Sequence, residues 1–411
     1  MAERVAGDAH DTVARVARDS YGKLLAFLAI RTHDIAAAED ALADAFQAAL
    51  TTWPQRGVPR NPEGWLLTAA RRRGIDVTRR ERAFSNLLPV LSAADCAAAN
   101  GDGEEAFPDE RLAMLFLCAH PAIGAHVRTP LMLQVVLGLD AARIGSAFLV
   151  APATMGQRLS RAKAKIYHAR PSFELPSASD LPARLGAVLQ AIYAAYGSGW
   201  EGAAGSEARY GDLADEALAL GRLLVSQLPG EPEAYGLLAL MLLCEARRAA
   251  RRDARGAYVP LAAQDPARWS RPLIAEGLRA LRQAAQFRQI GRFQLEAAIQ
   301  SVHLERAESG VTNHAAIVAL YAGLLDLAPA AGVRVGYAAA LAETAGAVQG
   351  WTALQHIAPH QAERYQPYWA LAAHLLRLLG HRDEAGVAYD RAIALCTDAP
   401  TRAYLAEQRL G

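Results

Sequence analysis

Apolar residues recur at every third or fourth position through almost the whole chain, which is the spacing of one face of an α-helix. In the stretch IAAAEDALADAFQAAL the apolar positions are Ile35, Ala38, Leu42, Ala45, Phe46 and Ala49. No stretch alternates convincingly between apolar and polar residues, as a half-buried β-strand does. We therefore predict an all-α fold.

Two breaks divide this helical pattern. AADCAAANGDGEEAFPDE, residues 93–110, consists of small and acidic residues interrupted by Gly and Pro, which is typical of a linker. RPSFELPSASDLP, residues 170–182, contains three prolines and three serines and predicts a hinge. With 411 residues the chain is longer than a usual single domain. The expected parts are a first helical domain at 10–92, the acidic linker at 93–110, a second helical domain at 111–170, the hinge at 171–182 and a C-terminal helical domain at 183–411.

Charge is distributed unevenly along the first 170 residues. The net charge of the chain is +1, so the overall balance predicts no nucleic-acid partner. Residues 71–82, however, contain six arginines and two acidic residues, and residues 158–170 contain five basic residues and no acidic one. Residues 95–110 contain six acidic residues and no basic one. Any contact with nucleic acid must therefore depend on the two local basic segments.

The cysteines and the N-terminus bear on the compartment. The four cysteines, Cys96, Cys118, Cys244 and Cys396, are far apart and include no C-x-x-C pair, so neither a disulfide framework nor a structural zinc site is predicted. The first twenty residues carry charges throughout, and no apolar run reaches the roughly 20 residues that span a bilayer. We expect a cytoplasmic protein with no membrane partner, no metal and no cofactor.

The segment TPLMLQVVLGLDAARIGSAFLVAPATMGQRLSRAKAKI divides into three helices. We predict that the first runs from Pro130 to Leu137 and stops at Gly138. The second follows the N-cap Asp140 and packs through Ile144, Ala147 and Phe148. The third begins at Pro152 and packs through Met155, Leu159, Ala162 and Ile166. A short turn between two such helices is helix-turn-helix geometry, in which the second helix enters the major groove of DNA.

The polar side chains of that third helix suit DNA contact. Gln157, Arg158 and Arg161 are able to make bidentate contacts to bases or to reach phosphates. Thr154 suits a phosphate or a thymine methyl group, and Lys165 lies where backbone contacts are expected. A helical hairpin without functional consequence is the alternative, and the one-sided charge favours DNA binding over it.

Two features of the first domain carry further polar side chains. Asp40, Asp44 and Gln47 form an acidic ridge on the helix that begins at Ile35, for which a merely solvated face is the alternative. The loop from Trp53 to Asn61 is stiffened by Pro and Gly, and Asn61 is the expected N-cap of the next helix. The side chains that this loop and helix offer to a phosphate backbone or an unstacked base are Arg56, Arg60, Asn61, Trp65, Arg71, Arg72, Arg79 and Arg80. An Arg-rich helix that is only solvated is the alternative here.

The chain after Leu181 reads as a series of helices separated by Gly and Pro. In GHRDEAGVAYDRAIAL, Gly380, Ala385, Tyr389 and Ala392 have tetratricopeptide-like spacing, in which small residues let two antiparallel helices approach and Tyr fills the gap. The repeat is irregular, and we predict a helical-repeat domain.

Two motifs occur in order and at suitable separation. AEDALADAF with WPQRGVPRNPEGWLLTAARRRGIDVTRR, and then LMLQVVLGLDAARIGSAFLVAPATMGQRLSRAKAKI, resemble regions 2 and 4 of a bacterial sigma-70 superfamily factor of the extracytoplasmic-function type. Later segments, among them EPEAYGLLALMLL, RRDARGAYVPLAAQDPARW and HRDEAGVAYDRAIAL, resemble the subgroup with a long tetratricopeptide-like C-terminal extension. The resemblance covers nearly the whole chain. Gly156 departs from it, because the subgroup usually has alanine at this position.

The resemblance implies a sigma factor that binds core RNA polymerase and directs promoter-specific transcription initiation. It assigns Asp40, Asp44 and Gln47 to docking on the clamp helices of the polymerase β′ subunit, with the β flap as a second polymerase contact. The residues implied in melting and reading the minus-10 element are Arg56, Asn61, Trp65, Arg71, Arg72, Arg79 and Arg80. Those implied in reading the minus-35 element are Thr154, Gln157, Arg158, Arg161 and Lys165. We expect the C-terminal domain to regulate the sigma portion in cis and to offer a surface to a protein or peptide partner.

Two other functional classes are open to such a chain. An enzyme is the first, but no G-x-S-x-G, Walker loop, H-E-x-x-H or Cys/His cluster is present, and we expect no catalytic residue. The histidines at 303, 314, 356 and 360 lie in or beside amphipathic helices and are expected to be structural. The second class is a helical-repeat interaction scaffold whose sigma-like half no longer binds promoters. Such a scaffold would lack the steep salt dependence that phosphate contacts give to DNA affinity.

Overall fold

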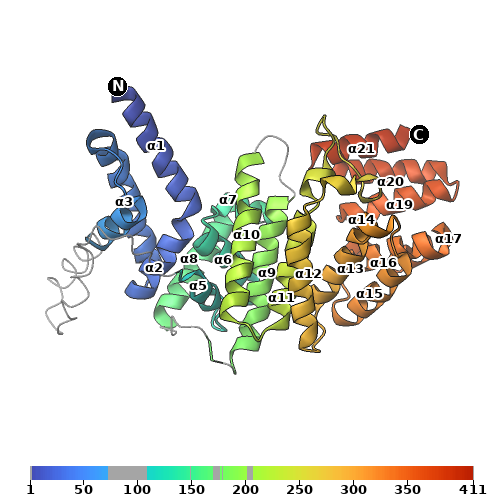
Figure 1. The fold of residues 1–411 in the computed structure, drawn as a ribbon, viewed down its shortest axis with the longest axis horizontal. Helices are drawn as coiled ribbons and strands as arrows, with labels where there is room; N and C mark the ends of the chain where they lie inside the picture. Colours follow the sequence, from blue (N-terminus) through green and yellow to red (C-terminus); the bar gives the residue numbers. More distant parts are fainter. Residues whose placement is uncertain are drawn as a thin grey trace. The chain divides into compact units, whose positions relative to one another are not determined.

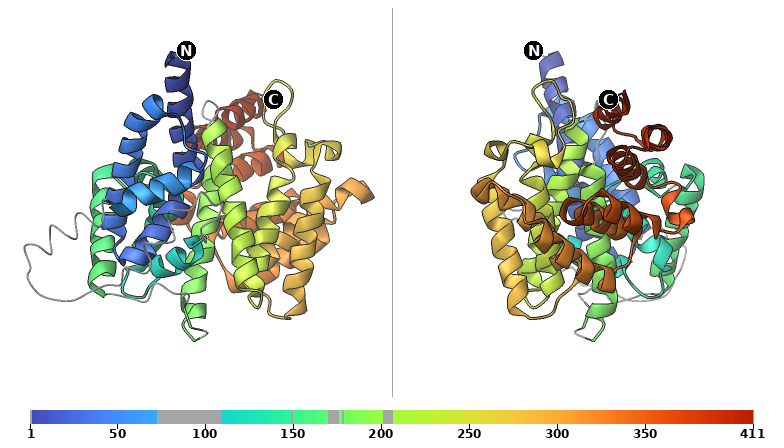
Figure 2. Two further views of the ribbon diagram at one scale, coloured as in Figure 1. Left: turned by 60° about the vertical axis from the view of Figure 1, so that its left-hand side comes forward. Right: turned by 90° about the vertical axis from the view of Figure 1, so that its right-hand side faces the viewer.

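The computed structural model describes residues 2–72, 109–148, 150–169, 176–177, 179–200 and 207–410. Within these ranges the chain forms helices joined by turns and has no β-strand. The β-type pairing there is one isolated bridge between Arg252 and Tyr258. Figures 1 and 2 show this helical architecture from three sides. The prediction of an all-α fold is confirmed.

The chain forms two compact units, residues 1–192 and residues 193–411. The division falls inside helix α9 (Leu181–Trp200), immediately after Ile192. Most of the predicted acidic linker lies outside the described residues, as does part of the predicted hinge.

The first unit begins with α1 (Ala2–Asp19), α2 (Tyr21–Thr32) and α3 (Ile35–Arg56). Asp34 is the N-cap of α3, and its carboxylate accepts a hydrogen bond from the Ala37 N–H at 3.1 Å. The residues that α3 buries include the predicted apolar positions Ile35, Ala38, Leu42, Ala45 and Ala49, whereas Phe46 is only half-buried.

The loop predicted from Trp53 to Asn61 is four residues shorter than expected. Helix α3 continues through Pro54 to Arg56, because Trp53 is anchored in the core with 1% of its surface exposed. Proline costs a helix interior one backbone hydrogen bond, and this burial offsets that cost. The helix ends at Gly57, whose φ of +86° favours glycine and whose N–H donates to the Trp53 carbonyl at 2.9 Å.

The first unit also contains α5 (Arg111–Cys118), α6 (Ala125–Leu137), α7 (Ala141–Ala147) and α8 (Pro152–Ala169). Helix α2 packs on α5 and α6, and α8 packs on α6 and α3. A Cβ atom placed on Gly22 of α2 would lie 1.7 Å from the Val136 carbonyl oxygen of α6, so only glycine allows this approach. The helices before and after the predicted linker are therefore packed into one body.

The second unit contains helices that pack mainly on their neighbours in chain order. They are α10 (Glu207–Gln227), α11 (Pro232–Glu245), α12 (Arg271–Gln286), α13 (Arg292–Leu304), α14 (Arg306–Ser309), α15 (His314–Leu327), α16 (Ala331–Ala345), α17 (Ala347–Gln355), α18 (Pro359–Ala362), α19 (Gln366–Leu378), α20 (Arg382–Leu395) and α21 (Ala399–Leu410). Three short 3₁₀ helices, Arg248–Arg251, Leu261–Ala263 and Pro266–Arg268, lie between α11 and α12.

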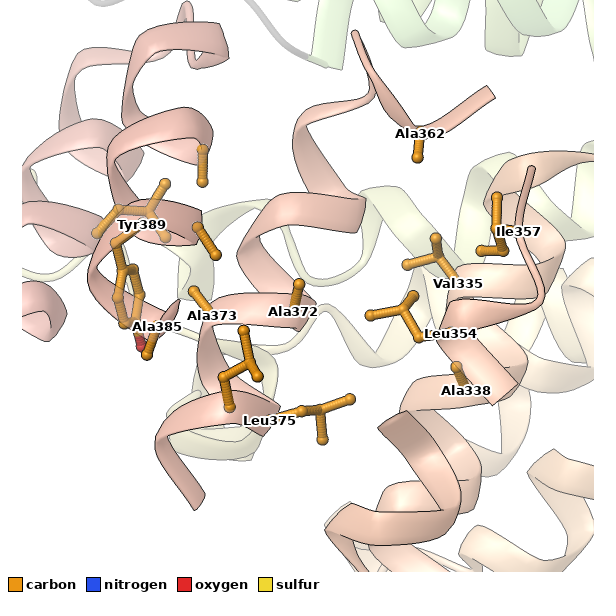
Figure 3. Close-up of a cluster of buried hydrophobic side chains, with 14 of the residues drawn as sticks. Val335, Ala338, Leu354, Ile357, Ala362, Ala372, Ala373, Leu375, Ala385 and Tyr389 are labelled. Carbon is orange, nitrogen blue, oxygen red and sulfur yellow. The ribbon is translucent and has the colours of Figure 1, made fainter. Parts of the chain in front are cut away.

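A buried cluster joins α16, α17, α19 and α20 (Figure 3). Ala385, Tyr389 and Ala392 of the predicted repeat motif are all in it, each less than 5% exposed. Gly380 has a different role from the one predicted. It adopts a φ of +83° in the turn between α19 and α20, and nothing lies within 4 Å of the position of a Cβ atom there. This glycine serves the turn rather than the approach of two helices.

No helix in the described part of the chain is both long enough and apolar enough to cross a membrane.

Candidate nucleic-acid interface

Local sequence signals define both ends of the helices around the predicted DNA-reading element. Helix α6 stops at Gly138, which takes a φ of +64°, and Asp140 caps α7 by accepting a hydrogen bond from the Arg143 N–H at 2.8 Å. Both ends were predicted. The start of α6 was not, since this helix begins at Ala125 and contains Pro130 in its interior. Burial of Val127 and Pro130 favours the longer helix despite the missing N–H.

The turn between α7 and α8 depends on Gly145, which was not among the predicted site residues. The Val150 N–H donates to the Gly145 carbonyl at 2.8 Å, which folds the turn back against α7. A Cβ atom at Gly145 would lie 2.6 Å from the Val150 carbonyl oxygen, closer than real Cβ contacts allow. The signal in the sequence is a glycine in a short helix directly before an apolar turn. Phe148 was predicted to pack inward, but it is 37% exposed, because α7 ends at Ala147 and Phe148 lies beyond the helix as its C-cap.

Helix α8 separates an apolar face from a polar one as predicted. Met155, Leu159, Ala162 and Ile166 are each no more than 4% exposed. The five predicted DNA-reading residues, Thr154, Gln157, Arg158, Arg161 and Lys165, are all exposed. Three cationic side chains and two polar ones therefore line the outer face of a helix that contains no acidic residue.

One basic residue of α8 is engaged inside the unit. Lys163 forms an ion pair with Glu39 of α3 at 2.5 Å, and the two side chains are 14% and 20% exposed. Nearby, burial and the charge of Glu39 raise the pKa of Tyr21 to about 12. Burial likewise raises the pKa of the Cys118 thiol well above its usual range. This internal contact was missed because a sequence gives no indication of which of several basic residues faces another helix.

The acidic ridge of α3 is only partly exposed. Asp40 and Gln47 are exposed, whereas Asp44 is half-buried. These residues extend over two turns of a helix whose opposite face is packed in the core. The structure thus leaves a polar ridge at the surface, beside the Glu39 that pairs with Lys163.

The residues predicted for the minus-10 element have different environments. Arg56 and Arg72 are exposed, and exposed Asn61 caps the helix at residues 62–72 through a hydrogen bond from the Gly64 N–H at 2.9 Å. Trp65 is half-buried, with its ring 5.5 Å from that of Trp53 in an edge arrangement. Arg79 and Arg80 lie outside the described residues.

The Arg71 guanidinium stands 5.1 Å from the centre of the Phe27 ring, and that of Arg31 stands 3.4 Å from the same centre. Ser20 donates a hydrogen bond to the Glu63 carboxylate, which holds the start of the 62–72 helix against α2. The half-buried members of this set therefore contribute to packing, and the exposed ones face solvent.

Among the described residues, no three His, Cys, Asp or Glu side chains are grouped closely enough to hold a metal ion. Burial, followed by the charges of Arg247, His314 and Arg306, lowers the pKa of His303 to about 4. This half-buried histidine is therefore neutral at pH 7. Among the described cysteines, Cys118 and Cys244 are free thiols.

Comparisons with known proteins add one family and one relative. Residues 184–285 match a protein family described as a family of unknown function (DUF6596). The chain is 39% identical over 377 residues to "Uncharacterized protein R00370" of Rhizobium meliloti (strain 1021), an alignment that covers 90% of this chain and 89% of that protein. No solved structure gives a significant match.

Proposed function

The chain belongs to the same family as the Rhizobium meliloti protein R00370, and we propose that it is a sigma factor of the extracytoplasmic-function type. In this role it binds core RNA polymerase in the cytoplasm and directs it to promoters. The polymerase carries out the chemistry, and this chain contributes recognition without catalysis.

The observation that carries the proposal is the arrangement of α7 and α8. A capped short helix, a tight turn that requires Gly145 and an 18-residue helix with one buried face follow one another in the order expected of a helix-turn-helix. A helix of this length extends about 27 Å. Its N-terminal half presents Thr154, Gln157 and Arg158, the chemical types that contact base edges and phosphates in the major groove.

The ridge of α3 supports docking on the polymerase. Asp40 and Gln47 are exposed on a helix whose far side is fixed in the core, so a partner would meet a rigid polar surface. Arg56, Asn61 and Arg72 are the exposed residues of the neighbouring region that suit the minus-10 element.

Packing within the first unit supports a closed resting state. Helix α3, which carries the polymerase-docking ridge, is joined to α8 by the Glu39–Lys163 pair, so the two helices must separate if polymerase and the minus-35 element hold them at different sites. The C-terminal unit regulates this opening in cis.

The experiment is a titration of fluorescent core RNA polymerase with the full-length protein. We expect submicromolar binding that Asp40→Arg with Asp44→Arg weakens at least tenfold. Glu308→Arg with Glu407→Arg reverses two exposed charges in the second unit and serves as the matched control. If the wild-type chain does not bind core polymerase, the proposal fails and the helical-repeat scaffold becomes the better description.

A further inference from the structure

The second unit contains an aromatic recess formed by α17, α18, α19 and α20. Two adjoining cavities of about 300 and 610 Å³ share the side chains of Trp351, Tyr368 and Trp369. The recess lies over the buried cluster of Figure 3, whose Ala372 lines the smaller cavity and whose Ile357 lines the larger. We call this surface the aromatic recess.

The aromatic side chains of the recess are held in place. Tyr368 and Trp369 have ring centres 5.3 Å apart and planes at 84°, an edge-to-face pair. The Trp369 indole N–H donates to the Glu363 carbonyl at 3.3 Å. All three rings are half-buried, so each has a packed side and an accessible side. The recess is thus preformed, and binding would not require ordering of these rings.

The lining of the recess contains two carboxylates. Glu363 lines the larger cavity and Glu384 lines the smaller, and both residues are exposed. Neither lining set, in this fully described part of the chain, includes Lys or Arg. The nearby histidines include His360 in the lining, His356 between the lining residues Gln355 and Ile357, and His381 beside Glu384. One cation already approaches from α20, where the Arg391 guanidinium stands 6.0 Å from the Trp369 ring centre. An aromatic face near carboxylates favours a cation.

We propose that the aromatic recess binds a basic peptide segment of a partner protein, with an arginine or lysine side chain over the Trp351 and Trp369 rings and close to Glu363 and Glu384. Apolar side chains of the peptide cover Val387, which is 69% exposed. Two connected cavities exceed the space that one small cation fills, and their size suits several consecutive side chains. The carboxylates would repel a nucleic-acid backbone. The inference does not depend on the first unit binding polymerase.

To test this proposal, random dodecapeptides displayed on phage are selected for binding to the full-length protein. The affinity of synthetic copies of the enriched peptides is then measured by fluorescence anisotropy. We expect enriched peptides to carry Arg or Lys next to apolar residues. Glu363→Lys with Glu384→Lys should weaken their binding at least tenfold, and replacing the peptide arginine by neutral citrulline at least fivefold. The matched control, Glu308→Lys with Glu407→Lys, should leave the affinity within twofold.

Trp369→Ala is a second probe of the recess, provided that circular dichroism shows an unchanged fold. If that variant unfolds, the test depends on the exposed charge-reversal variant, Glu363→Lys with Glu384→Lys. The proposal is overturned by any of three results: no enrichment, enrichment of acidic or uncharged peptides, or equal binding by the charge-reversed protein. It is also overturned if sedimentation shows a dimer that Val387→Asp dissociates, since a second copy would then cover the recess.

Discussion

The carboxylate of Glu39 on α3 and the ammonium group of Lys163 on α8 stand 2.5 Å apart, and both side chains are mostly buried. The contact joins the helix proposed to dock on polymerase to the helix proposed to read DNA. Removing one partner leaves the other charge partly desolvated without its counter-charge. A charge-assisted hydrogen bond of this kind contributes about 1.5 to 3 kcal/mol.

Glu39→Gln is therefore expected to lower the free energy of unfolding by about 1 to 3 kcal/mol, measured by urea denaturation. The exchanged pair, Glu39→Lys with Lys163→Glu, should recover more than half of that loss. The neighbouring exposed Asp40→Asn is the control and should change stability by less than about 0.5 kcal/mol. A neutral effect of Glu39→Gln would mean that the pair does not hold these helices together.

Gly22→Ala is expected to force α2 away from α6. The added methyl group would stand 1.7 Å from the Val136 carbonyl oxygen, which is backbone and has no side-chain freedom to yield. Overpacking of this kind costs about 1 to 3 kcal/mol or more in thermal or urea unfolding. Gly186→Ala in α9 is the matched control, because nothing lies near its Cβ position, and it should stabilise by up to about 1 kcal/mol. Similar effects of the two substitutions would count against the close approach.

The two glycines on either side of the turn between α7 and α8 should respond in opposite directions to alanine. At Gly145 the new Cβ would meet the Val150 carbonyl at 2.6 Å, so the turn must open and DNA binding should be lost. At Gly156 the nearest atom is Ala141 Cβ at 3.9 Å, an ordinary contact, so the substitution should stabilise by about 1 kcal/mol through helix propensity. Unfolding curves and DNA titrations of both variants check this, and a stable, DNA-binding Gly145→Ala protein would contradict it.

The helices could be predicted from the apolar periodicity of the sequence. The contacts between residues far apart in the sequence could not. The buried stripe of α8 and the caps Asp140 and Asn61 follow from local rules and were predicted correctly. Trp53 and Pro130 were assigned to a loop and a helix start because proline is a strong local break, yet burial of Trp53 and Val127 extends both helices across a proline. The approach at Gly22 and the Glu39–Lys163 pair depend on which helices meet, and no local pattern contains that information.

Arg158→Glu with Arg161→Glu is expected to weaken DNA binding and its dependence on salt. Each phosphate contact contributes about 0.9 to the slope of log affinity against log salt concentration, so the loss of two should reduce the slope by about 2. The measurement is fluorescence anisotropy in the presence of core polymerase, with a duplex selected from random sequence. Arg279→Glu with Arg282→Glu, on α12 of the second unit, carries the same charge change as a control. An unchanged slope would show that α8 does not contact the DNA backbone.

His303 should make the protein less stable in mild acid. The folded protein binds this proton only near pH 4, whereas an unfolded chain binds it near pH 6.5, so the unfolded state takes up more protons between these values. The free energy of unfolding therefore rises with pH across this window, and the contribution of neutral His303 is fully present above about pH 6.5. This contribution to the free energy of unfolding is at most about 3 kcal/mol, by the conversion of 1.36 kcal/mol per pKa unit.

His303→Gln keeps a neutral polar side chain. It should reduce the difference between the free energies of unfolding measured in urea at pH 7 and at pH 4.5. The same substitution at exposed His168 is the control. If the wild-type and His303→Gln proteins lose stability in parallel as the pH falls, another group governs the acid response.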